Sequence, residues 1–142
     1  MKTILLLPLL FCLFLSLPSK AAEVVVIVNL NNPISSLEKR EIIDLFMGKQ
    51  KAFRHGQSAR PFDQSESSIK ASFYHHLINK NLAQVNAYWA RLLFTGRASP
   101  PQELSDDQSI IEAVRKAPGA IAYIDSQWLD DSVKEVFRVQ KD

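Results

Sequence analysis

The sequence predicts an α/β fold in which strands alternate with amphipathic helices. A continuous β-branched run, Val-Val-Val-Ile-Val, lies within residues 23–30, and four later segments carry apolar side chains at helical spacing. Such a run is typical of a strand buried on both faces, as in a parallel sheet with helices on each side. Alternating strands and helices joined by right-handed crossovers place helices on both faces of the sheet.

Residues 1–22 are predicted to be a cleaved secretory signal peptide. Lys2 supplies the positive charge, residues 4–17 form an apolar run, and Ser19-Lys20-Ala21 offers small residues to a signal peptidase. The run is shorter than the ~20 residues that a membrane-spanning helix needs. We therefore expect an exported protein, periplasmic in a cell with an outer membrane, with residues 23–142 as one domain.

Composition excludes several function classes. Processing leaves 120 residues with 15 basic and 15 acidic side chains, and this neutral balance gives no support for nucleic acid or an anionic membrane as partner. The one cysteine, Cys12, leaves with the signal peptide, which excludes disulfides and thiol chemistry. No cofactor or metal is expected. The adjacent His75 and His76 lie about 100° apart on a helix and cannot readily share an ion.

The first strand and helix have clear boundaries in the sequence. The strand within 23–30 ends at Asn31-Asn32-Pro33. Ser35 and Glu38 predict a capping box, and Gly48 predicts the end of the helix. The apolar stripe of this helix consists of Leu37, Ile42, Leu45 and Phe46.

The middle of the chain is predicted to contain one short strand and two helices. Residues 49–59 are polar and predict a loop, and residues 60–63 predict the second strand. The two helices cover 69–78 and 82–93, with a break at 79–81. The side chains spaced along them are Ile69, Phe73, Leu77, Leu82, Val85, Trp89 and Leu92.

The last third is predicted as loop, helix, strand and edge strand. Two prolines end the loop at 95–101, and Ser105 with Gln108 predicts a capping box for a helix that Pro118-Gly119 terminates. Residues 120–124 predict a third strand. A final strand carries Val133, Val136 and Val139, and its irregular apolar pattern favours a sheet edge.

The polar turn after the second strand is the candidate ligand site. Ser65, Ser67 and Ser68 crowd a helix start, where backbone N–H groups lack intrahelical partners and favour an anion. Asp63 stands at the same strand end and is expected to oppose one. A plain helix cap would also explain these serines. Ligands of α/β folds lie beyond the carboxyl ends of strands, which gives the expected set Asn29, Asn31, Gln64, Ser65, Ser67 and Ser68.

Two loops carry further positive charge. The first holds Lys49, Lys51, Arg54 and Arg60 around His55, and we interpret it as a solvated loop, with attraction of an anion as the alternative. The second holds Arg97, an exposed cation that could meet a partner.

Matching segments along the chain carry a family resemblance. In order they are NNPISSL at 31–37, IDLFMGK at 43–49, PFDQ at 61–64, FY at 73–74, YWARLLFTG at 88–96 and PGAIAY at 118–123. They resemble periplasmic phosphate-binding proteins, the soluble components of phosphate ABC transporters in the type 2 periplasmic binding protein group. These proteins have two lobes with phosphate between them. The resemblance therefore implies one lobe of this fold, a small mixed sheet flanked by helices.

The resemblance also qualifies the ligand. In the family an arginine precedes a Ser-Gly-Thr helix start, and in register with Phe73 only Ser67 matches it. Ser68 and Ile69 replace the glycine and threonine, and Asp63 replaces the arginine. This implies weak binding of phosphate or another small anion.

Three functions follow from these inferences. The first is a solute-binding protein that works with an ABC permease, a sensor or a second copy of itself. The alternative is a periplasmic interaction module that has lost its ligand. An enzyme is the least expected, because no arrangement of nucleophile, base or paired carboxylates is recognisable.

Overall fold

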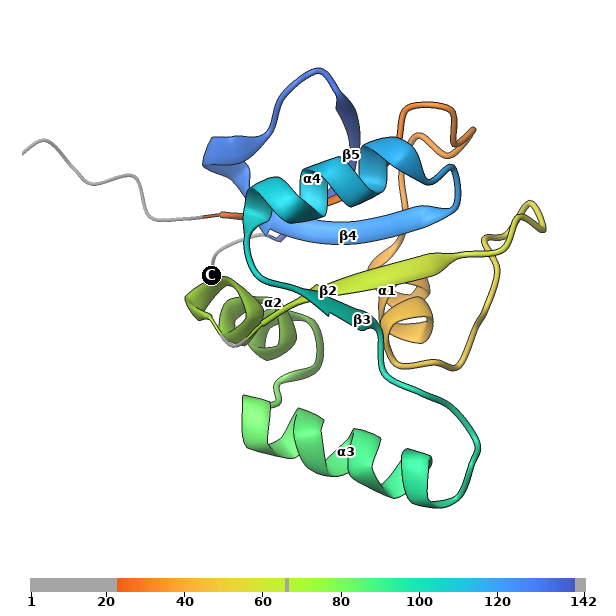
Figure 1. Ribbon diagram of the computed structural model, residues 1–142, viewed down its shortest axis with the longest axis vertical. Coiled ribbons are helices and arrows are strands. Elements are labelled where there is room, and N and C mark those ends of the chain that lie inside the picture. Colours follow the sequence, from red (N-terminus) through yellow and green to blue (C-terminus); the bar gives the residue numbers. More distant parts are fainter. Residues whose placement is uncertain (1–22, 66, 140–142) are drawn as a thin grey trace, which may run out of the picture.

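The computed structural model describes residues 23–65 and 67–139, so the predicted signal peptide lies outside the described residues (Figure 1). No helix among them has the length and apolar character needed to cross a bilayer. The elements in chain order are β1 (Val24–Asn29), α1 (Lys39–Phe46), β2 (Arg60–Gln64), α2 (Ser68–Ile78), α3 (Leu82–Phe94), β3 (Gln102–Leu104), α4 (Asp107–Lys116), β4 (Ala120–Asp125), a 3-10 turn (Ser126–Trp128) and β5 (Val133–Arg138).

The strands form one mixed sheet in the order β3-β2-β4-β1-β5. β2 pairs in parallel with β3 and β4, whereas β1 pairs antiparallel with β4 and β5. The α/β class and the mixed sheet are thus confirmed. The parallel pairing expected for the first strand is wrong. All six residues of β1 are buried because helices cover both faces of the sheet, and this burial does not depend on strand direction.

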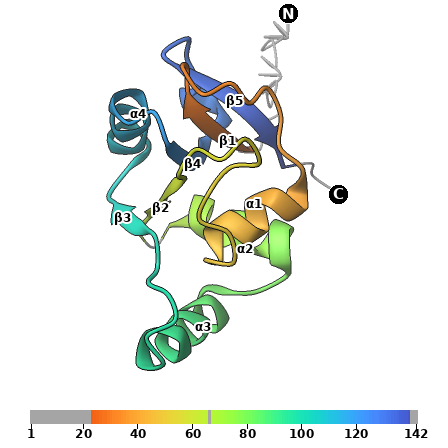
Figure 2. The same ribbon diagram turned by 90° about the vertical axis from the view of Figure 1, so that its right-hand side faces the viewer.

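Two apolar clusters fill the two faces of the sheet. Alternate side chains of β1 and β4 point to opposite faces, so Val26 and Tyr123 belong to one cluster and Ile27 and Ala122 to the other. The first cluster packs against α1 and α2, and the second packs against α4. Figure 2 shows α4 on one side of the sheet and α1 with α2 on the other.

The first helix begins one turn later than the sequence suggested. Its N-cap is Glu38, and Glu41 completes the capping box in place of the predicted Ser35–Glu38 pair. The reason is tertiary: the backbone N–H of Leu37 donates to the carbonyl of Val136 in β5 at 2.9 Å. This bond holds the preceding segment against the sheet, so the helix cannot start before it.

Two features of the last third also differ from expectation. The N-cap of α4 is Asp106, whose carboxylate accepts from the N–H of Ser109 at 2.7 Å, and not Ser105. Strand β3 formed part of no prediction, because its three residues acquire strand geometry only by pairing with β2. The final strand, β5, does lie at the sheet edge as predicted.

Helix α3 lies apart from the sheet and packs on α2 (Figure 1). Val85 and Trp89 are its buried residues. Near its C-terminus, Leu93 is 53% exposed and Phe94 is 94% exposed. The helix therefore lies at the periphery of the domain, with its C-terminal end exposed.

Candidate functional site

The turn between β2 and α2 brings the three predicted serines together. Ser65, Ser67 and Ser68 are all exposed at the start of α2. Ser67 is the N-cap, and its hydroxyl oxygen accepts from the backbone N–H of Lys70 at 3.1 Å. The hydroxyl therefore satisfies the helix itself, while the N–H groups of the first turn face outward, as at any helix start.

Gln64 joins this turn to the start of α4. Its side chain is buried, and its Nε2 donates to Oδ1 of Asp107 at 2.7 Å and to the carbonyl of Tyr123 at 3.2 Å. The same Asp107 oxygen accepts from the backbone N–H of Asp125 at 3.1 Å. The Gln64 side chain thus connects β2 to α4 and β4. Asp107 is a carboxylate at the candidate site that was not predicted from the sequence. No local pattern marks it, because its position depends on the pairing of β2 with β4.

The structure places Asn29 and Asn31 at the opposite end of the sheet from the serines. Nδ2 of Asn29 donates to the carbonyls of Val114 and Arg115 at the end of α4, at 2.9 and 3.0 Å. Its Oδ1 accepts from the N–H of Asn31 at 2.9 Å. The six expected ligand residues therefore do not converge. The physical reason is direction: β1 runs antiparallel to β4, whereas β2 runs parallel to it.

Asp63 does not face the candidate site, contrary to the sequence-based expectation. Its carboxylate is buried on the α2 face of the sheet, where the hydroxyl of Tyr74 donates to Oδ2 at 2.6 Å and the hydroxyl of Tyr123 donates to Oδ1. The backbone N–H of Gln64 also donates to Oδ1, at 2.9 Å. Asp63 therefore organises the core beneath α2 and contributes no open negative charge to the turn.

Burial has the largest effect on the pKa values of Asp63, Tyr74 and Tyr123. It raises the pKa of Asp63, although the hydrogen bonds from Tyr123 and Tyr74 and the charge of Lys70 act in the opposite direction. Burial, followed by the charge of Asp63, also raises the pKa of Tyr74 and of Tyr123 well above 10. Both hydroxyls therefore stay protonated and donate to Asp63 at neutral pH.

The cation in the first turn of α2 is already neutralised. Lys70 is 3% exposed, and its Nζ lies 2.7 Å from Oε1 of Glu103 and 3.9 Å from Oδ2 of Asp63. It therefore cannot serve as a free partner for a ligand at the turn. The described residues also contain no group of three or more side chains suited to a metal ion.

The chemistry available at this turn is limited to hydrogen bonding. Exposed backbone N–H groups and serine hydroxyls can hold an oxyanion, and a helix N-terminus contributes about 0.3–1 kcal/mol to such binding. Asp107 lies on the Gln64 side of the turn and works against it. The arrangement fits weak binding of a small anion.

Solved structures similar to this chain include proteins of phosphate transport. A protein from Clostridium perfringens, described as a phosphate ABC transporter substrate-binding protein with bound phosphate, has a TM-score of 0.64 at 20% identity and covers 81% of this chain and 44% of its own. An ABC-type phosphate transport receptor from Vibrio cholerae gives 0.64 at 15% identity, with coverage of 81% and 45%. PstS from Borrelia burgdorferi gives 0.62 at 12%, with coverage of 81% and 46%.

These comparisons define the class of fold. The chain has the α/β fold of a single lobe of phosphate ABC transporter substrate-binding proteins, and it spans less than half the length of the proteins it matches. Those proteins are described as components of phosphate transport. No protein-family model matches the sequence, and no curated protein matches it.

Proposed function

We propose that this chain is an exported solute-binding-like lobe that holds phosphate or a similar small oxyanion weakly at the start of α2. The observation that carries the proposal is the exposure of Ser65, Ser67 and Ser68 at the start of α2, on a fold shared with phosphate transport proteins. The hydroxyl of Ser68 and the hydroxyl hydrogen of Ser67, whose oxygen caps the helix, act as donors, and the first turn of α2 supplies the N–H groups.

The same geometry argues that the lobe binds weakly on its own. Lys70 is neutralised by Glu103, and Asp107 lies beside the turn. A second surface across the turn would exclude water and strengthen each hydrogen bond to the anion. In this proposal an ABC permease, a sensor or a second copy of the chain supplies that surface in the periplasm.

Substitutions at Ser67 separate anion binding from helix capping. Aspartate caps a helix as well as serine does, so Ser67→Asp keeps the cap while it places a negative charge at the proposed site. We expect Ser67→Asp to abolish phosphate-induced shifts of the amide resonances of residues 67–70 in ¹⁵N NMR titrations. Ser35→Asp adds the same charge at an exposed position far along the chain and should leave these shifts unchanged.

Thermal denaturation gives an independent readout of the same site. Phosphate at ten times its Kd should stabilise the protein by about 1.4 kcal/mol, and this gain should vanish in Ser67→Asp. Absence of any stabilisation by phosphate, sulfate or small carboxylates at millimolar concentrations would contradict the proposal.

The alternative is an interaction module without a ligand. The specific observation in its favour is the apolar end of α3, where Phe94 is 94% exposed and Leu93 is 53% exposed. Substitution of both by serine should then release a partner recovered with the protein from the periplasm, while anion titrations show no response. A partner retained by the double variant would argue against this alternative.

A further inference from the structure

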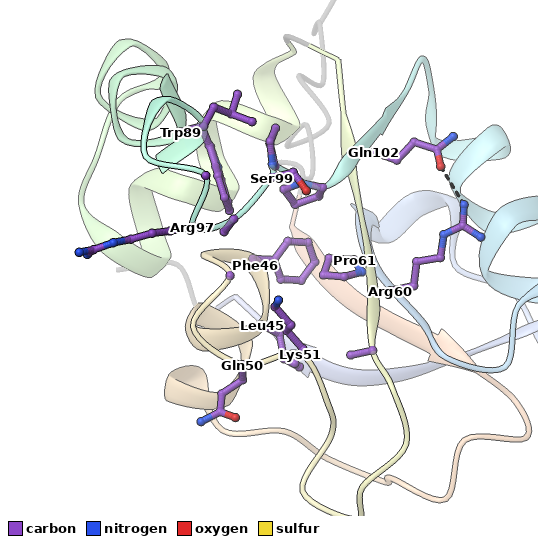
Figure 3. Close-up of a pocket in the computed structure, with 17 residues that line it drawn as sticks. Leu45, Phe46, Gln50, Lys51, Arg60, Pro61, Trp89, Arg97, Ser99 and Gln102 are labelled. Carbon is purple, nitrogen blue, oxygen red and sulfur yellow. Dashed lines mark hydrogen bonds between the residues drawn. The ribbon is translucent and has the colours of Figure 1, made fainter. Parts of the chain in front are cut away.

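A groove of about 590 Å³ lies between α1 and the segment that runs from α3 to β3 (Figure 3). Leu45 and Phe46 of α1, Pro61 of β2 and Trp89 of α3 form its apolar walls. Arg60 and Pro61 belong to the first half of β2, whereas the serine turn follows its last residue. The groove is therefore distinct from the candidate site at the start of α2.

The charge lining this groove has one sign. Lys51, Arg60 and Arg97 line it, and no aspartate or glutamate does. The two stretches that build it, residues 45–62 and 67–102, contain no acidic residue at all. Residues 23–142 carry equal numbers of basic and acidic side chains. The lack of acidic residues in these two stretches therefore produces a local excess of positive charge.

These three cations have no carboxylate partners among the described residues. Six other basic side chains form ion pairs there: Arg40, Arg54, Lys70, Arg115, Lys116 and Arg138. Arg60 is held in place by neutral groups, because its guanidinium donates to Oε1 of Gln102 at 3.0 Å and lies 4.9 Å from the centre of the Phe62 ring. In Figure 3, Lys51 lies beside Leu45 and Phe46, while the side chain of Arg97 extends outward and that of Arg60 reaches across β2 toward Gln102.

The Trp89 side of the groove offers apolar surface. Trp89 is 6% exposed, and its ring lies against Gly48, where an added Cβ would come within 3.1 Å of the ring. The indole Nε1 is buried and has no hydrogen-bond acceptor in the described part of the chain. Because this donor is buried with a ring that lines the groove, its resonance reports on changes in the packing there.

We propose that this groove binds a small organic anion. Its acidic group, a carboxylate or a phosphate monoester, is held by Lys51, and the charges of Arg60 and Arg97 add to the positive potential around the groove. Its apolar or aromatic body lies against Leu45, Phe46 and Trp89. The groove volume is within the range of about 300–1,000 Å³ typical of small-molecule sites. This ligand differs from the inorganic oxyanion proposed for the serine turn, because it needs an apolar body as well as a charge.

Three probes separate the two requirements: phenyl phosphate, inorganic phosphate and phenol. The protein has two tryptophans, so Trp128→Phe leaves a single indole N–H resonance, that of Trp89, in ¹⁵N NMR spectra. We expect phenyl phosphate to shift this resonance and to bind about tenfold more tightly than phosphate or phenol alone, since each of these keeps only one set of contacts.

Lys51 and Lys49 provide a matched pair of variants. Both are exposed and lie in the same loop, but only Lys51 lines the groove. Lys51→Gln should weaken phenyl phosphate binding about tenfold by removing a charge-assisted contact, and Lys49→Gln should change it less than twofold. Equal effects of the two variants would show that phenyl phosphate responds only to the general positive charge of this surface, and this result would overturn the proposal.

The remaining outcomes are equally decisive. An indole resonance that does not move, or phenyl phosphate binding no tighter than phosphate, would overturn the proposal. Ser67→Asp distinguishes the two sites: it should leave the Trp89 shift intact while it abolishes the response of residues 67–70 to phosphate. The groove and the serine turn can therefore fail independently.

Discussion

The hydroxyl of Tyr74 donates a 2.6 Å hydrogen bond to Oδ2 of Asp63 and so holds this carboxylate inside the core. The hydroxyl of Tyr123, 60 residues along the chain from Asp63, donates to the other carboxylate oxygen. An acid that the sequence placed at a ligand site is thus part of the packing between α2 and the central strand β4.

Removal of the Asp63 carboxylate should destabilise the fold strongly. Asp63→Ala leaves the hydroxyls of Tyr74 and Tyr123 buried without their acceptor, and the expected loss in the free energy of unfolding is about 2–4 kcal/mol. Urea denaturation measures it. Arg40→Ala, which breaks an ion pair between the exposed Arg40 and the partly buried Asp44, should cost less than about 1 kcal/mol. Equal losses for the two variants would contradict the role of the buried cluster.

Neutralising Asp63 should not improve anion binding. The carboxylate is 4% exposed and faces the core, so Asp63→Asn removes no charge from the serine turn. We expect the affinity for phosphate, measured by NMR titration at residues 67–70, to change less than twofold. Asp107→Asn removes a carboxylate that does lie beside the turn, and it should raise the affinity more than Asp63→Asn does. The reverse order would show that Asp63 faces the ligand after all.

The buried tyrosines should make the protein sensitive to alkali. The pKa values of Tyr74 and Tyr123 are raised above 10 in the folded protein, so their contribution to stability is fully present below pH 10. Above pH 10 the unfolded chain loses these protons and the folded chain keeps them, so the free energy of unfolding falls. The expected slope is about 1.4 kcal/mol per pH unit for each tyrosine.

Urea denaturation between pH 8 and 11 would measure this slope. Tyr123→Phe removes one of the two groups and should make the decline shallower, even though the variant starts from a lower stability. A slope that is unchanged in Tyr123→Phe would assign the effect to other groups.

Gly119 should tolerate no side chain, because the backbone of a neighbouring segment approaches it. An added Cβ would lie 2.4 Å from the carbonyl oxygen of Ser58, beside the bond from the N–H of Arg60 to the carbonyl of Gly119 at 2.8 Å. Gly119→Ala should therefore separate the starts of β2 and β4, at a cost of about 1–3 kcal/mol or more in unfolding free energy.

Gly96 provides the control for this substitution. It has a φ of 69° with nothing within 4 Å of an added Cβ, so Gly96→Ala should cost only the backbone strain of about 1 kcal/mol. Urea denaturation of both variants compares the two costs. A smaller loss for Gly119→Ala than for Gly96→Ala would show that the approach of Ser58 is readily relaxed.

Local patterns along the chain were sufficient for most of the fold. The β-branched run at 24–28, the apolar stripes of the helices and the break at Asn79 all correspond to observed elements. Ser67 was also recognisable as a helix start, because capping depends on residues within one turn of it. What these signals lacked was direction: a buried strand has the same composition whether its neighbours run parallel or antiparallel to it.

The functional geometry depended on contacts between distant segments. Pairing of β1 antiparallel to β4 moved Asn29 away from the serine turn, and the two buried tyrosines turned Asp63 into the core. The same long-range packing brought Lys51 and Arg97, from two separate loops, to one groove. Helical and strand periodicity are properties of neighbouring residues, so they can be recognised in the amino-acid sequence itself. Which side chains share a site is a property of strand order and packing, and it exists only once the sheet has formed.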